Sequence, residues 1–243
     1  MRILKHLPNF LTSLNLACGS LAVFFALNGH IEWSVWLILT GALFDFSDGF
    51  AARALKAYSD MGKELDSLAD LVSFGLAPAA IFSTLIKYLI TGDVTTSFDS
   101  LPPDAGVVVL IPFILAVFSG LRLAKFNIDT RQTESFLGLT TTATGIFTAS
   151  FAYIVLAQPD LFGWLNEYIV LGMVIFFSIM LVSEVPMFSL KFKNFGFAGN
   201  IERYLVLAVA VMSVMWLGVG GIAVTIFFYI IYSLIKWLIT KRS

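Results

Sequence analysis

Long apolar segments separated by short polar ones make up most of the chain. They extend over residues 10–28, 33–52, 66–90, 106–126, 139–158 and 167–185. Because a helix needs about 20 mostly apolar residues to cross the hydrocarbon core of a membrane, each segment predicts one transmembrane helix. A further stretch, from Tyr204 to Ile235, contains no charged residue and is too long for one crossing. We expect it to form two helices that reverse at the Gly-Val-Gly-Gly sequence of residues 218–221.

This pattern predicts an all-α integral membrane protein with about eight spans, or six if the last two helices only dip into the bilayer. The composition supports a membrane protein, because 58% of the residues are hydrophobic and only 13% are charged. Soluble domains carry about 25% charged residues. The sequence therefore excludes a soluble enzyme and a disordered regulator.

The charged residues predict how the chain is oriented. With the N-terminus in the cytoplasm, every Lys and Arg except Lys87 falls on the cytoplasmic side, which is the side that basic residues prefer. We therefore expect a protein of the cytoplasmic (inner) membrane. The net charge of −1 gives no basic excess, so we predict no nucleic-acid partner. One cysteine and two histidines exclude an internal disulfide and a zinc site built from nitrogen and sulfur ligands alone.

Four aspartates depart from the rule that acidic residues are rare inside membrane spans. Asp45 and Asp48 lie near the end of the second apolar segment, and Asp66 and Asp70 lie at the start of the third. Residues three or four apart share one face of an α-helix, so each pair points in one direction. The connecting polar loop is short. We therefore expect two neighbouring antiparallel helices whose carboxylates converge at the cytoplasmic boundary.

Converging carboxylates repel one another unless a cation lies between them. Ligation by oxygen alone, without His or Cys, favours Mg²⁺, Mn²⁺ or Ca²⁺. Mg²⁺ prefers one or two carboxylates together with substrate phosphates, which predicts a phosphate-bearing substrate. Nearby, Gly49 and Ala52 leave room for a ligand, and Arg53 offers a planar guanidinium to phosphate. A helix cap or an ion pair is the simpler explanation for either aspartate pair alone, but not for both pairs with this spacing.

Residues 45–70 read DFSDGFAARALKAYSDMGKELDSLAD. They match the motif D-x2-D-G-x2-A-R-x8-G-x3-D-x3-D, and the chain therefore resembles the CDP-alcohol phosphatidyltransferases. The resemblance implies a six-helix membrane core, here residues 1–185, and a homodimer. Residues 186–243 would add a C-terminal transmembrane hairpin and a basic tail.

The resemblance also implies the roles of individual residues. Two Mg²⁺ or Mn²⁺ ions would be bound at the cytoplasmic interface, and Asp70 would also act as the general base. The CDP-linked lipid would be bound by a further set of residues. The implied ligands are Asp45, Asp48, Asp66 and Asp70 for the metals, and Asn9, Thr12, Gly49, Ala52, Arg53 and Gly62 for the lipid.

Three further stretches are similar to the integral-membrane phosphatidylserine synthases of that family. They are residues 8–19, 66–79 and 119–138. This similarity implies CDP-diacylglycerol and L-serine as substrates, with phosphatidylserine and CMP as products. We expect the anionic groups of serine or of the lipid to contact Ser119, Arg122, Lys125 and Asn127, and the ammonium of serine to contact Glu134.

Several alternatives stay open. Asn9 and Thr12 also suit the N-terminal cap of the first span, and Arg122 and Lys125 also suit a purely topological role. The acceptor alcohol is alternatively glycerol 3-phosphate or an inositol phosphate. A cation-coupled transporter would also place carboxylates inside a helical bundle, although it would not need Gly49, Ala52 and Arg53 at this spacing.

Overall fold

We describe the protein from a computed structural model of the whole chain. The structure describes residues 3–128, 136–188, 196 and 199–242. Glu134 lies outside these ranges, and so do four of the basic residues that predict the orientation: Arg2, Arg131, Lys191 and Lys193.

The described residues form helices almost throughout, and their order follows the apolar segments of the sequence. The chain begins with η1 (Ile3–His6), α1 (Leu7–Leu27), α2 (Ile31–Leu55), α3 (Asp60–Asp70), η2 (Leu71–Leu76) and α4 (Ala77–Thr91). It continues through η3 (Phe98–Ser100), α5 (Pro103–Leu110), η4 (Ile111–Phe113), α6 (Ile114–Ile128), α7 (Thr141–Ala157), η5 (Pro159–Phe162) and α8 (Glu167–Val182). The last two helices are α9 (Ile201–Leu217) and α10 (Gly220–Arg242), and two short strands, β1 (Phe136–Leu137) and β2 (Pro186–Met187), pair in antiparallel fashion.

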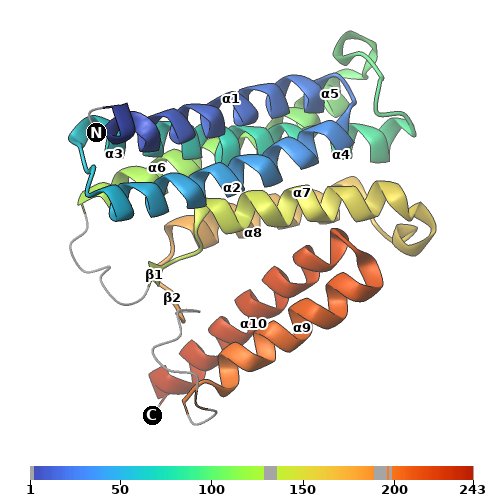
Figure 1. The fold of residues 1–243 in the computed structure, drawn as a ribbon. Helices are drawn as coiled ribbons and strands as arrows, with labels where there is room; N and C mark the ends of the chain where they lie inside the picture. The colour runs from blue at the N-terminus through green and yellow to red at the C-terminus, as the bar shows by residue number, and fades with distance from the viewer. Residues whose placement is uncertain (1–2, 129–135, 189–195, 197–198, 243) are drawn as a thin grey trace.

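Five of these helical segments are long and apolar enough to cross a membrane: Leu7–Leu27, Ile31–Leu55, Asp60–Thr91, Pro103–Ile128 and Gly220–Lys241. Two shorter apolar helices, Thr141–Ala157 and Glu167–Val182, lie between them. The predicted all-α integral membrane protein is therefore confirmed, while the count of eight spans stays a prediction. Both chain termini lie at the same end of the bundle, opposite the loop between α4 and α5 and the loop between α7 and α8 (Figure 1).

The centre of the bundle is α4, in which all residues from Ala77 to Ile86 are buried. Helices α1, α2, α7 and α8 pack against it. The sequence of α4 is apolar on every side, as expected of a helix that is surrounded by other helices. Its two buried hydroxyl groups are satisfied by neighbouring backbone, because Ser83 donates to Val109 O at 2.6 Å and Thr84 donates to Ala26 O at 2.8 Å.

A π-helical turn, η2, interrupts the third predicted span directly after Asp70. Neighbouring helices approach this turn closely at two glycines. A Cβ atom on Gly19 of α1 would lie 2.6 Å from the Cα atom of Ser73, and one on Gly145 of α7 would lie 3.0 Å from the Cα atom of Phe74. Such π-turns are rare and occur often at functional sites. The apolar pattern predicts one uninterrupted helix here, because the one extra residue of a π-turn hardly changes the pattern of apolar positions.

Helix α1 packs against both α2 and α3, whereas α2 and α3 make little backbone contact with each other. The two helices face each other through their aspartate side chains, as predicted, but without close backbone packing. The loop between them is short, as predicted, and includes Lys56 in a left-handed conformation with φ of 50°. The gap between the two backbones leaves space that the aspartate side chains reach into.

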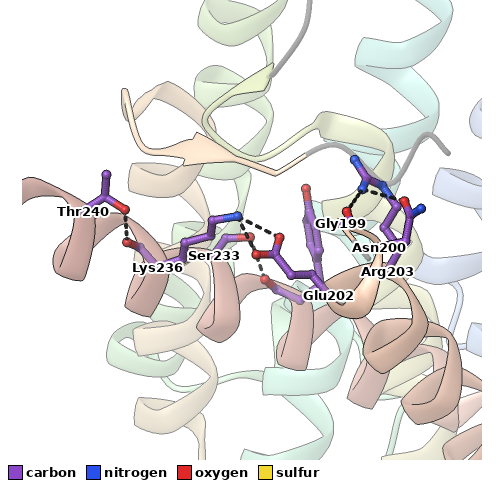
Figure 2. Close-up of polar contacts among 8 residues, drawn as sticks. Gly199, Asn200, Glu202, Arg203, Ser233, Lys236 and Thr240 are labelled. Carbon is purple, nitrogen blue, oxygen red and sulfur yellow. Dashed lines mark hydrogen bonds and ion pairs between the residues drawn. The ribbon is translucent and has the colours of Figure 1, made fainter. Parts of the chain in front are cut away.

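Helices α9 and α10 form the predicted C-terminal hairpin, which lies beside α7 and reverses at Gly218 with φ of 56° (Figure 1). Figure 2 shows the polar contacts at its open end, of which the pair of Lys236 and Glu202 joins α10 to α9. Lys236 Nζ donates to the two carboxylate oxygens of Glu202 at 2.6 and 2.8 Å. Arg203 Nη1 donates to Asn200 Oδ1 at 2.9 Å and to Gly199 O at 3.1 Å. The division of the chain at residue 185 stays a prediction.

Candidate active site

Three of the four predicted aspartates form one cluster. Asp45 and Asp48 of α2 and Asp66 of α3 each offer a carboxylate oxygen, and these three oxygens lie within 4.8 Å of one another. Asp70 lies one turn beyond Asp66 and interacts electrostatically with all three. The helical spacing in the sequence thus brings the carboxylates together, as predicted, across the gap between α2 and α3.

The cluster is held from the side of α1. Thr12 donates a hydrogen bond to Asp48 Oδ2 at 2.6 Å, and Asp48 is only 5% exposed. A hydrogen bond to a charged acceptor is stronger than one between neutral groups. Thr12 lies six residues inside the helix rather than at its N-cap, which is His6. The capping role considered for Thr12 is therefore excluded, and so is that for Asn9, which lies within the first helical turns.

The aspartates fit a site for divalent cations. Asp66 Oδ1 and Asp70 Oδ1 are both buried and have no hydrogen-bond partner among the described residues. Buried polar atoms normally have a partner, and buried carboxylates normally have a counter-charge. All four residues supply oxygen ligands, which match Mg²⁺ or Mn²⁺. The donors in this cluster therefore suit the metals that the sequence predicts.

A cavity of about 220 Å³ adjoins the cluster. It is bordered by the first turns of α1, the last turns of α2 and the start of α3. Eight of its lining residues are among the predicted site residues: Asn9, Thr12, Asp48, Gly49, Ala52, Arg53, Gly62 and Asp66. The tertiary structure thus gathers the residues assigned to the CDP-linked lipid around one space. Asp45 and Asp70 do not line it.

The glycine at position 62 is explained by its neighbours. A Cβ atom there would lie 2.9 Å from Asn9 Oδ1 and 3.0 Å from Ser59 Oγ. Ser59 is the N-cap of α3 and accepts a hydrogen bond from Gly62 N at 3.0 Å. On the opposite wall, a Cβ atom on Gly49 would lie 3.5 Å from Arg53 Nη1. Both glycines keep the cavity open beside the polar groups that face it.

The residues predicted to bind the acceptor on α6 have different positions. Arg122 is 6% exposed, its Nε donates to Leu139 O at 2.6 Å, and it interacts electrostatically with Asp70. Asn127 donates to Ser67 Oγ at 2.9 Å, which ties the end of α6 to α3. Ser119 is fully buried behind the π-turn, where a Cβ atom on Gly75 would lie 2.8 Å from the Cβ atom of Ser119. Lys125 forms an exposed ion pair with Glu184 at 3.3 Å.

Arg122 alone among these four therefore carries a charge next to the carboxylate cluster. Ser119 and Lys125 do not line the cavity at the cluster. Ser119 packs against Gly75 of the π-turn, and Lys125 pairs with Glu184.

Sequence reasoning missed several residues of the site. Tyr58, Ser59 and Lys63 line the cavity, and Lys63 Nζ also donates to Asn127 O at 3.2 Å. Serine three residues before Gly62 is a recognisable helix-cap signal. Asn15 is fully buried near Asp70, and the signal that marks it is an amide in an otherwise apolar stretch.

The sequence profile of the CDP-alcohol phosphatidyltransferases matches residues 5–231, which includes all of the site described above. The chain belongs to the CDP-alcohol phosphatidyltransferase family.

Among the relatives of this phosphatidyltransferase is the CDP-diacylglycerol–serine O-phosphatidyltransferase of Bacillus subtilis. It is 37% identical over 136 residues, which are 56% of this chain and 69% of that protein. The protein of the same name from Helicobacter pylori is 27% identical over 234 residues, which are 95% of this chain and 90% of that protein. The yeast protein of that name is 38% identical over 134 residues, covering 52% of this chain and 43% of its own.

Proposed function

We propose that this phosphatidyltransferase transfers the phosphatidyl group of CDP-diacylglycerol to the hydroxyl group of L-serine, giving phosphatidylserine and CMP. The observation that carries the proposal is the aspartate cluster beside a cavity lined by Gly49, Ala52 and Arg53. The names of its relatives in Bacillus subtilis and Helicobacter pylori support serine as the acceptor.

Asp45, Asp48, Asp66 and Asp70 would hold two divalent cations, Mg²⁺ or Mn²⁺. When bound, these ions polarise the phosphate oxygens of the donor and stabilise the charge that develops on the leaving group. The neighbouring cavity takes the CMP part of the donor. Gly49 and Ala52 let it approach α2 closely, Arg53 contacts a phosphate, and Asn9, Thr12 and Gly62 form the facing wall.

Asp70 acts as the general base. The serine hydroxyl is a poor nucleophile, so its proton must be removed as its oxygen attacks the phosphorus of the phosphatidyl group. In that step the bond from phosphorus to the serine oxygen forms, and the bond from phosphorus to the bridging pyrophosphate oxygen breaks. CMP leaves with that oxygen, and the serine proton passes to Asp70.

Arg122 binds the carboxylate of serine. Its guanidinium lies next to Asp70 and uses Nε to hold Leu139 O, while a guanidinium carries four further N–H donors. A carboxylate bound there brings the serine hydroxyl toward Asp70. The other three residues hold α6 in place beside the site. Ser119 packs against the π-turn, Lys125 pairs with Glu184, and Asn127 donates to Ser67. Glu134, proposed for the ammonium, lies outside the described residues.

We further propose that the carboxylate end of the bundle faces the cytoplasm in the inner membrane, that the enzyme is a homodimer, and that residues 1–185 are its catalytic core. The basic residues at this end favour that orientation. In it, the hairpin of residues 186–243 crosses the membrane twice and returns the chain to the cytoplasm.

The test is a parallel assay of acceptors. Purified enzyme is given CDP-diacylglycerol, Mn²⁺ or Mg²⁺, and either serine, glycerol 3-phosphate or inositol phosphate, and CMP release is measured together with the lipid product. We expect product with serine alone. Product with a phosphorylated alcohol instead would refute serine as the acceptor, and metal-dependent cation transport without CMP release would favour a transporter.

A variant tests the base. Asp70→Asn is expected to bind CDP-diacylglycerol within about threefold of the wild type but to lose about 10²-fold or more in turnover, because general-base catalysis contributes about 10²–10⁴-fold. Near-normal turnover of this variant would rule out Asp70 as the base.

A further inference from the structure

Asn15 is a buried amide for which the packing of the bundle gives no reason. It lies in the middle of α1, and its side chain is fully buried. Neither Oδ1 nor Nδ2 has a hydrogen-bond partner within the described part of the chain. An unpaired buried amide is costly, and native proteins rarely keep one without a function.

Three elements meet at Asn15. Its Oδ1 faces Gly41 of α2, where a Cβ atom would lie only 2.9 Å away. Its backbone oxygen accepts a hydrogen bond from Ser73 Oγ of the π-turn at 2.9 Å. Its side chain interacts with the carboxylate of Asp70, whose Oδ1 is likewise buried without a partner. The two unpaired groups, one amide and one carboxylate, therefore lie side by side at the junction of α1 with the π-turn.

Helix α1 thus presents one polar side chain to each aspartate pair. Thr12 donates to Asp48, from the pair on α2. Asn15 follows three residues later on the same face of α1 and lies against Asp70, from the pair on α3. Asp70 also directly precedes the π-turn, so Asn15 lies beside both the carboxylate and the segment that sets its position.

We propose that Asn15 is a positioning residue for Asp70. In the metal-loaded enzyme its Nδ2 would donate a hydrogen bond to one carboxylate oxygen of Asp70 and thereby leave the other oxygen aimed at the cations and at the acceptor hydroxyl. Carboxylates that ligate metals are commonly oriented in this way by a hydrogen bond from a neighbouring group. This inference rests on the proposed function, because it assigns Asn15 to the residue proposed as the base. The competing explanation is that Asn15 only fills space between the helices.

Two substitutions separate these explanations. Asn15→Leu keeps the branched shape of the side chain and removes the donor, and Asn15→Asp keeps both shape and size and replaces the donor by an acceptor. Full-length protein in detergent is titrated with Mn²⁺ alone, with bound Mn²⁺ followed by electron paramagnetic resonance. The kcat and the KM for CDP-diacylglycerol are measured separately.

We expect both variants to bind Mn²⁺ about 10- to 100-fold more weakly and to lose about 10²-fold in kcat, which is the low end of the contribution of a general base. The KM for CDP-diacylglycerol should stay within about threefold, since the cavity that binds the donor does not include Asn15. The matched control is Ser178→Ala in α8, which removes another buried polar group that has no hydrogen-bond partner among the described residues. It should leave both readouts unchanged.

A folded Asn15→Leu protein with Mn²⁺ affinity and kcat within twofold of the wild type would overturn the proposal. If Asn15→Leu does not fold, Gly41→Ala takes its place, because a Cβ atom at position 41 displaces the amide without removing it. Loss of Mn²⁺ affinity and kcat in that variant supports the proposal, and unchanged values overturn it. The Mn²⁺ titration needs no acceptor, so it tests Asn15 even if serine proves not to be the substrate.

Discussion

The contact between Gly19 of α1 and the π-turn gives a sharp prediction, because it links packing directly to the site. A Cβ atom on Gly19 would lie 2.6 Å from Ser73 Cα and 2.7 Å from Ser73 N. Carbon atoms in van der Waals contact are about 3.5–4.0 Å apart, so Gly19→Ala must move α1 and the π-turn apart by about 1 Å. The obstacle is backbone, and no side-chain rotation removes it.

This displacement has two expected effects. Overpacking of this kind costs about 1–3 kcal/mol of stability, so the midpoint of thermal unfolding in detergent should fall. Asp70 lies three residues before Ser73 and moves with it. A misplacement of about 1 Å at a catalytic group costs about 10²-fold in rate, so kcat should fall by about that factor.

The matched control is Gly172→Ala in α8, where a Cβ atom would meet nothing within 4 Å. Replacing glycine by alanine inside a helix gains about 0.5–1 kcal/mol, so this variant should unfold at the same or a slightly higher temperature and keep full activity. Both proteins are purified in the same detergent and assayed for unfolding and CMP release. A Gly19→Ala protein as stable and as active as Gly172→Ala would refute the reasoning.

Three further predictions concern the aspartate cluster and the residues of α6. Thr12→Val removes the 2.6 Å hydrogen bond to Asp48. Since hydrogen bonds to charged groups contribute about 1.5–3 kcal/mol, Mn²⁺ binding measured by titration should weaken about tenfold or more. An unchanged affinity would show that this contact does not hold the cluster. Removal of divalent cations by EDTA should abolish CMP release, and added Mg²⁺ or Mn²⁺ should restore it; activity that survives complete chelation contradicts a metal-dependent site. Lys125→Met breaks an exposed ion pair with Glu184, and such pairs contribute about 0–1 kcal/mol. The unfolding midpoint and the KM for serine should therefore both change little and match those of Glu184→Gln, whereas a large rise in the KM of Lys125→Met alone would place Lys125 in the serine site.

The sequence predicted the convergence of the aspartates well because the relevant information is local. Asp45 and Asp48, and likewise Asp66 and Asp70, are spaced so that helical geometry alone puts each pair on one face. Their occurrence at the ends of apolar segments marks them as functional, since a membrane protein does not keep unpaired carboxylates there without a reason. The residues that line the cavity fall within the same short motif or at the start of α1.

The roles of the polar residues on α6 were harder to predict. Arg122, Lys125 and Asn127 lie within six residues of one another and look alike in a sequence, as polar side chains at one end of a span. In the folded protein Arg122 is buried beside Asp70, Lys125 pairs with Glu184, and Asn127 holds α3. Which of them contacts a substrate depends on partners from α3, from the segment after α8 and from the residues around 139. The spacing within α6 says nothing about those partners.

The sequence by itself determined that the chain is a helical membrane protein, which aspartates converge, and where most of the apolar helices begin and end to within a few residues. These properties follow from hydropathy and helical periodicity, which act over one segment at a time. Only the tertiary structure decided that α1 packs against both α2 and α3, that the third span contains a π-turn after Asp70, and that Asn15 lies beside that carboxylate. These features depend on which backbones approach closely, and the close approach is possible because Gly19, Gly41 and Gly145 have no side chains where their neighbours lie.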